Sequence, residues 1–251
     1  MPSLPQYPGR KVHLDGEYHS CERRLGYTGR MFIGHAAVGL ASKRLAPDSS
    51  LGILIAAPFA LDLLWPLFLL AGWERVRIDP GNTAFTPFDF VSYPYTHSLA
   101  MAAGWAVLFG FVYWAITRYA VGALVVSVGV VSHWVLDAVV HRPDLPLAPG
   151  GGVKVGLGLW NSIPGTMIVE GALFAAGVWI YSGATRPRDR IGAWGFWSFT
   201  AFLLLVYVSN AFGPPPPSER FLAWFGLALW LIPFWAQWFD RHREAVAGTA
   251  P

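Results

Sequence analysis

The feature that most constrains this chain is a series of apolar runs, each close to twenty residues long. A helix of ~20 apolar residues spans the ~30 Å hydrocarbon core of a bilayer. Inside lipid the backbone must satisfy its own hydrogen bonds, which leaves helices or closed barrels, and none of the runs alternates as a barrel strand does. The runs therefore predict transmembrane helices. They cover residues 51–72, 97–117, 120–141, 157–182, 193–212 and 220–239.

A seventh, weaker run covers residues 32–46, "FIGHAAVGLASKRLA". It is short for a full span and fits a half-helix or a re-entrant segment as well as a crossing. We therefore expect an all-α fold, a polytopic transmembrane helical bundle with six or seven membrane segments. Residues 31–242 form a single domain in this interpretation, and residues 243–251 form a flexible C-terminal tail.

Composition supports this class. Charged residues make up 13% of the chain and hydrophobic residues 54%, whereas a soluble domain has roughly 25% charged residues. We expect an integral, multi-pass membrane protein whose first partner is the lipid bilayer. The single cysteine, Cys21, excludes an internal disulfide. No basic stripe interleaved with aromatic residues is present, which argues against nucleic-acid binding.

The first thirty residues differ in kind from the rest. They are polar and rich in Pro and Gly, and they lack the apolar core of a secretory signal. Two interpretations compete: residues 1–30 form a disordered tail, or they lie upstream of a natural start at Met31.

The apolar run 120–141 carries an unusual polar pattern near its end, in "SHWVLDAVVH". His133, Asp137 and His141 are spaced four residues apart, so on a helix they drift by only ~80° and share one face over ~12 Å. Four of the seven histidines lie in or beside apolar runs. A charged group at the bilayer centre costs at least ~2.5 kcal/mol, so these groups need partners.

Other polar groups are placed to meet them. His97 opens the next run in "YPYTHSL", Asp62 lies within "APFALDLLWPL", and His35 lies near the start of the seventh run. Glu170 follows an interruption at Pro164. If all seven segments cross, His35, His97 and the end of run 120–141 lie at the same side of the membrane.

Imidazole nitrogens and carboxylate oxygens are the preferred donors of divalent metals. The pattern thus predicts a metal centre: zinc suits a His-rich set, and Mn or Mg suits one with more carboxylates. Bound metal lowers the pKa of a water ligand toward ~7 and supplies a nucleophile, while a remaining carboxylate acts as general base or orients a histidine.

Each residue alone has a structural interpretation. A single intramembrane histidine or Asp62 can form a hydrogen bond between helices, and Arg142 and Asp144 fit loop charges. Nine tryptophans near predicted helix ends fit an interfacial aromatic belt, so we discount them as site residues. They are Trp73, Trp105, Trp114, Trp160, Trp194, Trp197, Trp224, Trp235 and Trp238.

Together, "MFIGHAAVGLA", Asp62, "YPYTHSL" and "SHWVLDAVVHRPDLPL" resemble a bacterial family over residues 31–182. This is the family of LexA-regulated, membrane-bound metal-dependent hydrolases of the inner membrane, which carries a Pro-Asp-x-Asp element, a Thr-His-Ser segment and a Ser-His-x3-Asp element. The resemblance implies an inner-membrane location, a bundle fold and a metal site. It also implies supporting roles for Ser98 and Ser132. Its implied metal ligands or catalytic groups are His35, Asp62, His97, His133 and Asp137.

The chain departs from that pattern at two places. Asp62 lacks the earlier acid of the Pro-Asp-x-Asp pair, and no basic residue precedes Thr-His-Ser. A missing ligand could come from Asp89, His141 or Glu170. We expect catalytic roles for Asp62, Asp89 and Glu170. The expected metal ligands are His35, Asp62, His97, His133, Asp137 and His141.

Three functions remain open at this point. The first is a metal-dependent hydrolase acting on an amphipathic substrate, such as a lipid or an isoprenoid phosphate, through metal-activated water. The second is a proton- or ion-coupled transporter, which the interruption in "NSIPGTMIVE" favours. The third is a structural membrane protein with a metal staple.

Overall fold

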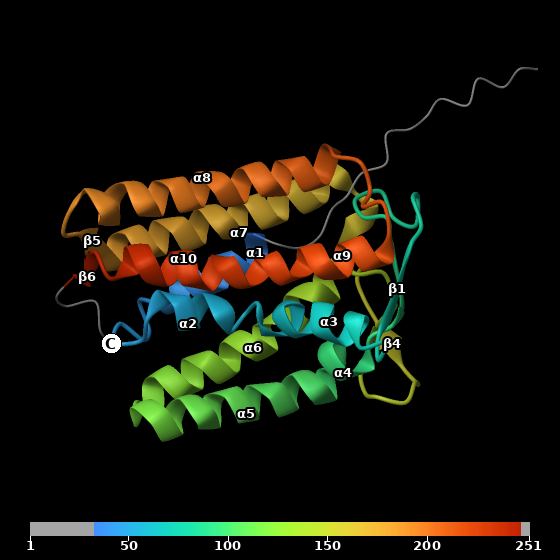
Figure 1. Cartoon of the computed structure of the whole chain (residues 1–251), viewed down its shortest axis with the longest axis horizontal. Coiled ribbons are helices and arrows are strands. Elements are labelled where there is room, and N and C mark those ends of the chain that lie inside the picture. The colour runs from blue at the N-terminus through green and yellow to red at the C-terminus, as the bar shows by residue number, and fades with distance from the viewer. Residues whose placement is uncertain (1–32, 247–251) are drawn as a thin grey trace, which may run out of the picture.

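The computed structural model describes residues 33–246, and their fold is dominated by helices that run along one long axis (Figure 1). Within the described residues, five stretches are long and apolar enough to cross a membrane. The predicted all-α bundle is confirmed. The five stretches are α5 (Leu99–Thr117), α6 (Ala120–Val140), α7 (Ile163–Ala184), α8 (Arg190–Phe212) and the combined stretch Glu219–Asp240.

The last stretch consists of α9 (Glu219–Gly226), the 3₁₀ turn η2 (Leu227–Trp230) and α10 (Leu231–Asp240). Large side chains on the outside of these long helices are apolar and exposed, as Ile116 (78%) and Trp179 (77%) illustrate. Monomeric soluble proteins rarely expose large continuous apolar surfaces. This exterior therefore suits lipid.

The expected six or seven membrane segments reduce to five of full length, because the other two runs form shorter helices. The run 32–46 forms α1 (Ile33–Ser42). The run 51–72 is divided into α2 (Leu51–Ala56) and α3 (Ala60–Leu70).

The division falls at Pro58, which has no N–H to donate and so cannot continue the helical hydrogen bonds of α2. The helical hydrogen bonds of α3 begin with Leu63 N donating to Phe59 O. The Pro58 carbonyl thus lies before the helix and is free to accept a hydrogen bond from elsewhere.

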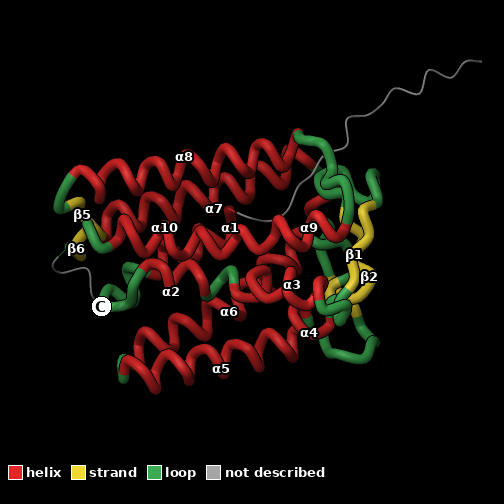
Figure 2. The backbone as a smooth tube through the Cα atoms, viewed as in Figure 1, coloured by secondary structure: helices red, strands yellow, loops and turns green. Residues whose placement is uncertain are grey.

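Three short antiparallel strand pairs lie at the two ends of the bundle (Figure 2). The expected loop 73–96 contains β1 (Arg75–Ile78) and β2 (Phe88–Ser92), which pair with each other. Near them, β3 (Leu145–Pro146) pairs with β4 (Lys154–Val155).

At the opposite end, β5 (Thr185–Pro187) pairs with β6 (Arg243–Ala245). The sequence predicted a flexible tail over residues 243–251, but this segment begins with the strand β6. The buried Arg243 guanidinium holds it in place by donating to Thr185 Oγ1 and to Gly192 O. Residues 1–32 and 247–251 are not described, so the prediction for residues 1–30 lies outside the described part of the chain.

Helix α1 lies inside the bundle, where it packs closely on α7. A Cβ atom on Gly177 would lie 2.6 Å from the Ala37 Cα atom, so only glycine permits this approach. At its C-terminal end the buried Lys43 Nζ donates to Asp240 Oδ2 of α10 at 2.8 Å. Asp240 also accepts from Tyr181 OH at 2.8 Å. These contacts fix α1, and with it His35, against the long helices.

Candidate metal centre

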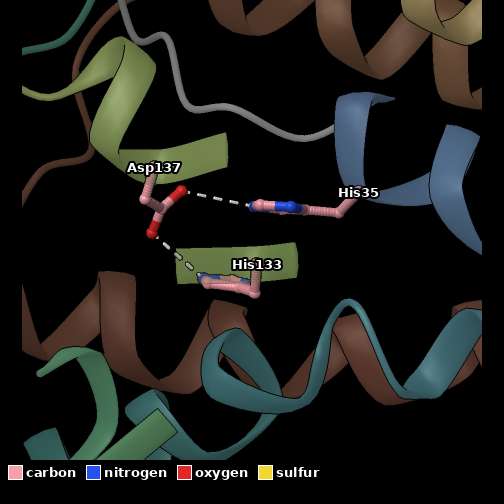
Figure 3. A group of neighbouring side chains, drawn as sticks. All are labelled: His35, His133 and Asp137. Atoms are coloured by element: carbon pink, nitrogen blue, oxygen red, sulfur yellow. Dashed lines mark ion pairs between the residues drawn. The ribbon is translucent and has the colours of Figure 1, made fainter. Parts of the chain in front are cut away.

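The centre is built around Asp137 in the C-terminal half of α6. His133 lies one turn earlier on the same face, with its Nε2 atom 3.1 Å from Asp137 Oδ2. The other oxygen, Oδ1, lies 3.4 Å from His35 Nε2 of α1. Figure 3 shows the carboxylate beside the two imidazoles, with one oxygen directed at each ring. The predicted i, i+4 pair on run 120–141 therefore meets His35 as the sequence analysis expected.

A second group adjoins the first. His97 Nε2 lies 3.3 Å from His133 Nε2, 3.6 Å from Asp62 Oδ1 and 3.8 Å from Asp137 Oδ2. Among residues 33–246, two sets of three donors are close enough to hold a metal ion, and they share His133. One set is His35, His133 and Asp137, and the other is Asp62, His97 and His133.

Local chain breaks bring His97 and Asp62 to this place. Pro94 begins the four-residue helix α4 (Pro94–His97), and Ser98 then adopts an extended conformation before α5. This bend places His97 in the interior instead of on the regular surface of α5. Asp62 lies in the first turn of α3, directly after the division at Pro58. Both side chains thus project from a helix boundary: His97 ends α4 just before α5, and Asp62 lies in the first turn of α3.

The cluster is almost fully excluded from solvent. His35 and His133 are 0% exposed, His97 is 3% exposed and Asp137 is 4% exposed. The His35 ring stacks on His133, with centroids 4.0 Å apart and planes 11° apart. Within the described residues neither nitrogen of His35 has a hydrogen-bond partner. A buried polar atom left in this way costs roughly 1–3 kcal/mol, and a ligand at Nε2 would remove that cost.

Each of the other three imidazoles is held from its outer side. His133 Nδ1 lies 2.7 Å from the Pro58 carbonyl oxygen, and His97 Nδ1 lies 2.6 Å from Thr96 Oγ1. His141 Nδ1 lies 3.0 Å from Asp144 Oδ1. In all three the Nε2 atom is turned inward. Outer partners of this kind orient metal-binding histidines and fix which nitrogen carries the proton.

His141 stands slightly apart from the ligand sets. Its Nε2 atom lies 3.9 Å from Asp137 Oδ2, and it belongs to neither group of possible metal donors among the described residues. The structure therefore brings the predicted ligand His141 to the edge of the cluster, paired with Asp144. Asp144, which we expected to be a loop charge, is instead a buried partner of this histidine.

Asp144 is also held by Tyr93, whose hydroxyl donates to Asp144 Oδ1 at 3.1 Å, and by Arg142 Nε at 3.0 Å. Burial acts to raise the pKa of Asp144, but the hydrogen bonds from His141, Arg142 and Tyr93 outweigh it and lower the pKa. Burial and the Asp144 charge raise the pKa of Tyr93 well above its usual range. Asp144 is thus kept as a carboxylate that accepts the Nδ1 proton of His141.

A small cavity of about 20 Å³ lies against the cluster. A site needs roughly 10–15 Å³ of such volume to hold one water. The cavity wall combines polar groups with large aromatic side chains. It is formed by Asp62, Trp65, Phe90, His97, Asp137, His141 and Trp160.

Trp160 corrects one expectation of the sequence analysis, which placed it in an aromatic belt. It is 3% exposed, and its ring centroid lies 4.3 Å from that of His141. The short helix η1 (Leu159–Asn161) turns it inward after β4. Composition alone does not distinguish a tryptophan at the lipid boundary from one that covers a site.

Several expected site residues lie elsewhere. Asp89, an expected catalytic group, pairs with Arg142 at 2.6 Å on β2 and is absent from the donor sets. Glu170, also an expected catalytic residue, is fully buried in α7. It is close enough to Tyr207 of α8 for an electrostatic interaction. Neither joins the donor sets found in residues 33–246.

The implied helpers Ser98 and Ser132 serve their own helices. Ser98 Oγ accepts from Met101 N at the start of α5 and donates to Pro94 O, while Ser132 Oγ donates to Gly129 O. Pro164 also differs from expectation: it occupies the first turn of α7, which then continues without a break to Ala184. Proline is tolerated there because the first turn needs no N–H donor.

Sequence reasoning missed Glu74, Thr96 and Tyr93. Glu74 is 2% exposed and binds Thr96, the neighbour of His97. The only available signal was Thr96 beside His97, since a hydroxyl next to a histidine can orient its ring. Comparisons of the chain with family models, curated proteins and solved structures gave no match. The family resemblance therefore stays a prediction based on the motifs.

Proposed function

We propose that this chain is a membrane-embedded, metal-dependent hydrolase. The observation that carries the proposal is the convergence of the Nε2 atoms of His97 and His133, 3.3 Å apart, beside the carboxylates of Asp62 and Asp137. The Pro58 carbonyl can only accept a hydrogen bond, so His133 donates to it through an N–H at Nδ1. In its neutral form this ring would present a lone pair at Nε2, and a cation bound among these donors would balance the carboxylates.

The donor set fits a transition metal. Two imidazoles with carboxylate oxygens match the ligands of Zn²⁺, and Mn²⁺ accepts the same donors. Mg²⁺ prefers an all-oxygen environment and fits least well. His133, His97, Asp62 and Asp137 would hold the ion, and His35 fits as a further donor through the Nε2 atom that has no hydrogen-bond partner. When bound, the metal would lower the pKa of a water ligand to ~7.

The residues at the cavity would supply proton transfer. His141 lines the cavity with its inward Nε2, and Asp144 holds its Nδ1 proton at 3.0 Å. This is the arrangement of a general base with an orienting carboxylate. His141 would take a proton from the attacking water at Nε2 and return it to the leaving group. We therefore assign His141 to acid–base work and the other histidines to metal binding.

The surroundings favour an amphipathic substrate. The cluster is enclosed by helices whose outer faces are apolar, so a substrate can approach from lipid. The aromatic wall of Trp65, Phe90 and Trp160 suits an acyl or isoprenoid chain beside the reacting phosphate or ester. A volume of about 20 Å³ accommodates one water, so binding of the substrate's reacting group requires these rings to move aside.

One observation favours ion or proton transport as a second candidate. The division between α2 and α3 at Pro58 lies directly beside the cluster, and divided helices frequently line transport sites. Uptake measurements in proteoliposomes distinguish this candidate from the hydrolase.

The test begins with elemental analysis of detergent-purified protein. Wild type should contain stoichiometric Zn or Mn, and His133→Ala and His97→Ala should lose it. His242→Ala is the matched control, because His242 pairs with Asp189 near β5 and β6, away from the cluster. Wild type should also hydrolyse a short-chain phosphatidic acid or an isoprenoid phosphate. Metal without turnover would indicate a structural staple, and metal-free wild type would overturn the proposal.

A further inference from the structure

We propose that Glu74 acts through Thr96 to fix which nitrogen of His97 carries the proton, and so holds His97 Nε2 ready to bind a metal. Glu74 is a positioning residue in this arrangement, since it touches neither the cavity nor a donor atom of the cluster. The effect on metal binding rests on the proposed function, but the position of the proton on His97 can be measured without metal.

Glu74 is buried, and its carboxylate accepts hydrogen bonds from the short helix that carries His97. Its Oε1 atom accepts from the backbone N–H groups of Tyr95 and Thr96, each at 2.8 Å. Its Oε2 atom accepts from Thr96 Oγ1 at 2.6 Å. Glu74 is 2% exposed, so water does not compete for these contacts. The carboxylate directly before β1 is thus tied to the first turn of α4.

These bonds leave one arrangement of protons. A carboxylate only accepts, so Thr96 must donate its single hydroxyl proton to Glu74. The Thr96 oxygen can then only accept from its second neighbour, His97 Nδ1, at 2.6 Å. In the neutral His97 ring the proton therefore lies on Nδ1, and the Nε2 atom that faces Asp62, Asp137 and His133 presents a lone pair.

The opposite tautomer would close the site. A proton on Nε2 of His97 would point at the carboxylate oxygen of Asp62, 3.6 Å away, and would occupy the position at which a metal binds. Since His133 is fixed independently by the Pro58 carbonyl, the two imidazoles depend on separate outer partners. The Glu74–Thr96 pair controls the imidazole of His97, which comes from α4.

Glu74→Gln tests this logic with little change in shape. The amide oxygen can still accept the two backbone N–H groups, so the start of α4 is retained. The amide nitrogen, however, donates to Thr96 Oγ1, and the hydroxyl proton of Thr96 then turns to His97 Nδ1. The proton of His97 moves to Nε2, and metal binding must first displace it.

Three further variants separate positioning from a loss of structure. Thr96→Val removes the hydroxyl at similar volume, so it should leave the proton of His97 unfixed and should weaken Zn²⁺ binding, as Glu74→Gln does. Thr96→Ser keeps the hydroxyl and should restore wild-type behaviour. Glu219→Gln removes an exposed carboxylate at the start of α9 and controls for the change in charge.

The first readout is the ¹⁵N NMR spectrum of metal-free protein labelled at histidine, with the His97 signals assigned from their loss in His97→Gln. Wild type, Thr96→Ser and Glu219→Gln should show a protonated Nδ1 and a bare Nε2 on His97. Glu74→Gln should show the reverse. A wild-type ring protonated on Nε2, or a pattern that Glu74→Gln leaves unchanged, would overturn the inference.

The second readout is Zn²⁺ affinity by chelator competition, with the visible spectrum of the Co²⁺-loaded protein. Removal of an outer partner of a ligating histidine typically weakens metal binding by about 10–100-fold. We expect that loss, with an altered Co²⁺ spectrum, for Glu74→Gln and Thr96→Val. Unchanged affinity in both would reject the role of Glu74. Absence of metal binding in wild type with the expected tautomer would reject the proposed function and leave the inference standing.

Discussion

The Nε2 atoms of His97 and His133 lie 3.3 Å apart, within the buried centre of the bundle. Each ring has its Nδ1 atom engaged with an oxygen behind it, Thr96 Oγ1 in one case and the Pro58 carbonyl in the other. Two imidazole nitrogens and two carboxylates this close to one another need a positive charge among them, from a bound cation or from a proton on an imidazole. These residues from α4 and α6 are therefore close enough, with Asp62 and Asp137, to hold a metal ion.

Removal of the metal should destabilise the protein measurably. A ligand at 100 times its Kd stabilises the folded state by ~2.7 kcal/mol, and in a chain of this size ~1 kcal/mol shifts Tm by roughly 2–4 °C. We expect a chelator to lower the Tm of wild type by roughly 5–10 °C, and added Zn²⁺ to restore it. Differential scanning fluorimetry in detergent measures the shift. His133→Ala should show no response to either, and an equal response in that variant would contradict the assignment of the donors.

Loss of His141 should separate turnover from metal binding. His141 lies outside both donor sets of the described residues and is oriented by Asp144. We expect His141→Gln to retain its metal and to lower the hydrolysis rate by ~100-fold or more, the usual contribution of a general base. Asp144→Asn should act in the same direction to a smaller extent. Rates on a short-chain lipid phosphate, with metal content in parallel, provide the measurement.

Asp79→Asn is the control for that series, because Asp79 is an exposed acid beside β1. It should leave both rate and metal unchanged. If His141→Gln instead loses its metal, His141 is a ligand, as the sequence pattern predicted, and not the base.

The central part of the site could be predicted from the sequence because it depends on local periodicity. His133 and Asp137 are one turn apart on any helix, so their shared face follows from spacing alone. His35 and His97 are polar groups at the start of apolar segments, and their alternation predicts the same end of the bundle only if all seven segments cross, whereas five helices are long enough to do so in the described residues. The structure brings all of these together with Asp62.

The outer partners could not be predicted in this way, since they depend on tertiary contacts. Glu74 and Thr96 are 22 positions apart in the sequence, and the pairing of β1 with β2 brings them together. The Pro58 carbonyl reaches His133 across 75 positions, and only because the helix is divided there. The strands near the site are too short to predict: β1 and β2 alternate apolar and polar residues over only four and five positions, and β3 and β4 have two residues each. The sequence therefore indicates the donors and not what holds them.

The far end of the bundle should contribute stability without affecting the metal. Lys43 Nζ, Leu51 N and Tyr181 OH all donate to Asp240, and both charged groups are buried. Loss of one partner from a buried ion pair typically costs about 3–5 kcal/mol. We expect Asp240→Asn to lower stability by about that amount in denaturant titrations, with metal content unchanged.

The exposed pair Arg186–Glu244 lies at the same end and provides the comparison. Glu244→Gln should leave stability nearly unchanged, because solvent screens exposed pairs. Equal effects of the two variants would show that burial of Asp240 is not the cause.

The close packing of α1 on α7 should control the metal centre from a distance. A Cβ on Gly177 would lie 2.6 Å from both the Ala37 Cα and its carbonyl oxygen, so Gly177→Ala must push α1 outward. Overpacking of this kind costs about 1–3 kcal/mol. Because His35 lies two residues before Ala37, the shift also moves its imidazole away from Asp137, which it approaches to 3.4 Å. We expect lower stability together with weaker Zn²⁺ binding.

Gly171→Ala and Gly183→Ala on the same helix are matched controls, since a Cβ at either position meets nothing within 4 Å. They should be neutral or stabilising by up to ~1 kcal/mol, because alanine is the better helix former. Thermal denaturation and chelator competition on the three variants compare the two effects directly. If Gly177→Ala lowers stability while Zn²⁺ affinity stays at the wild-type value, the contribution of His35 to the metal centre is excluded. If all three variants behave alike, the α1–α7 contact does not set the position of His35.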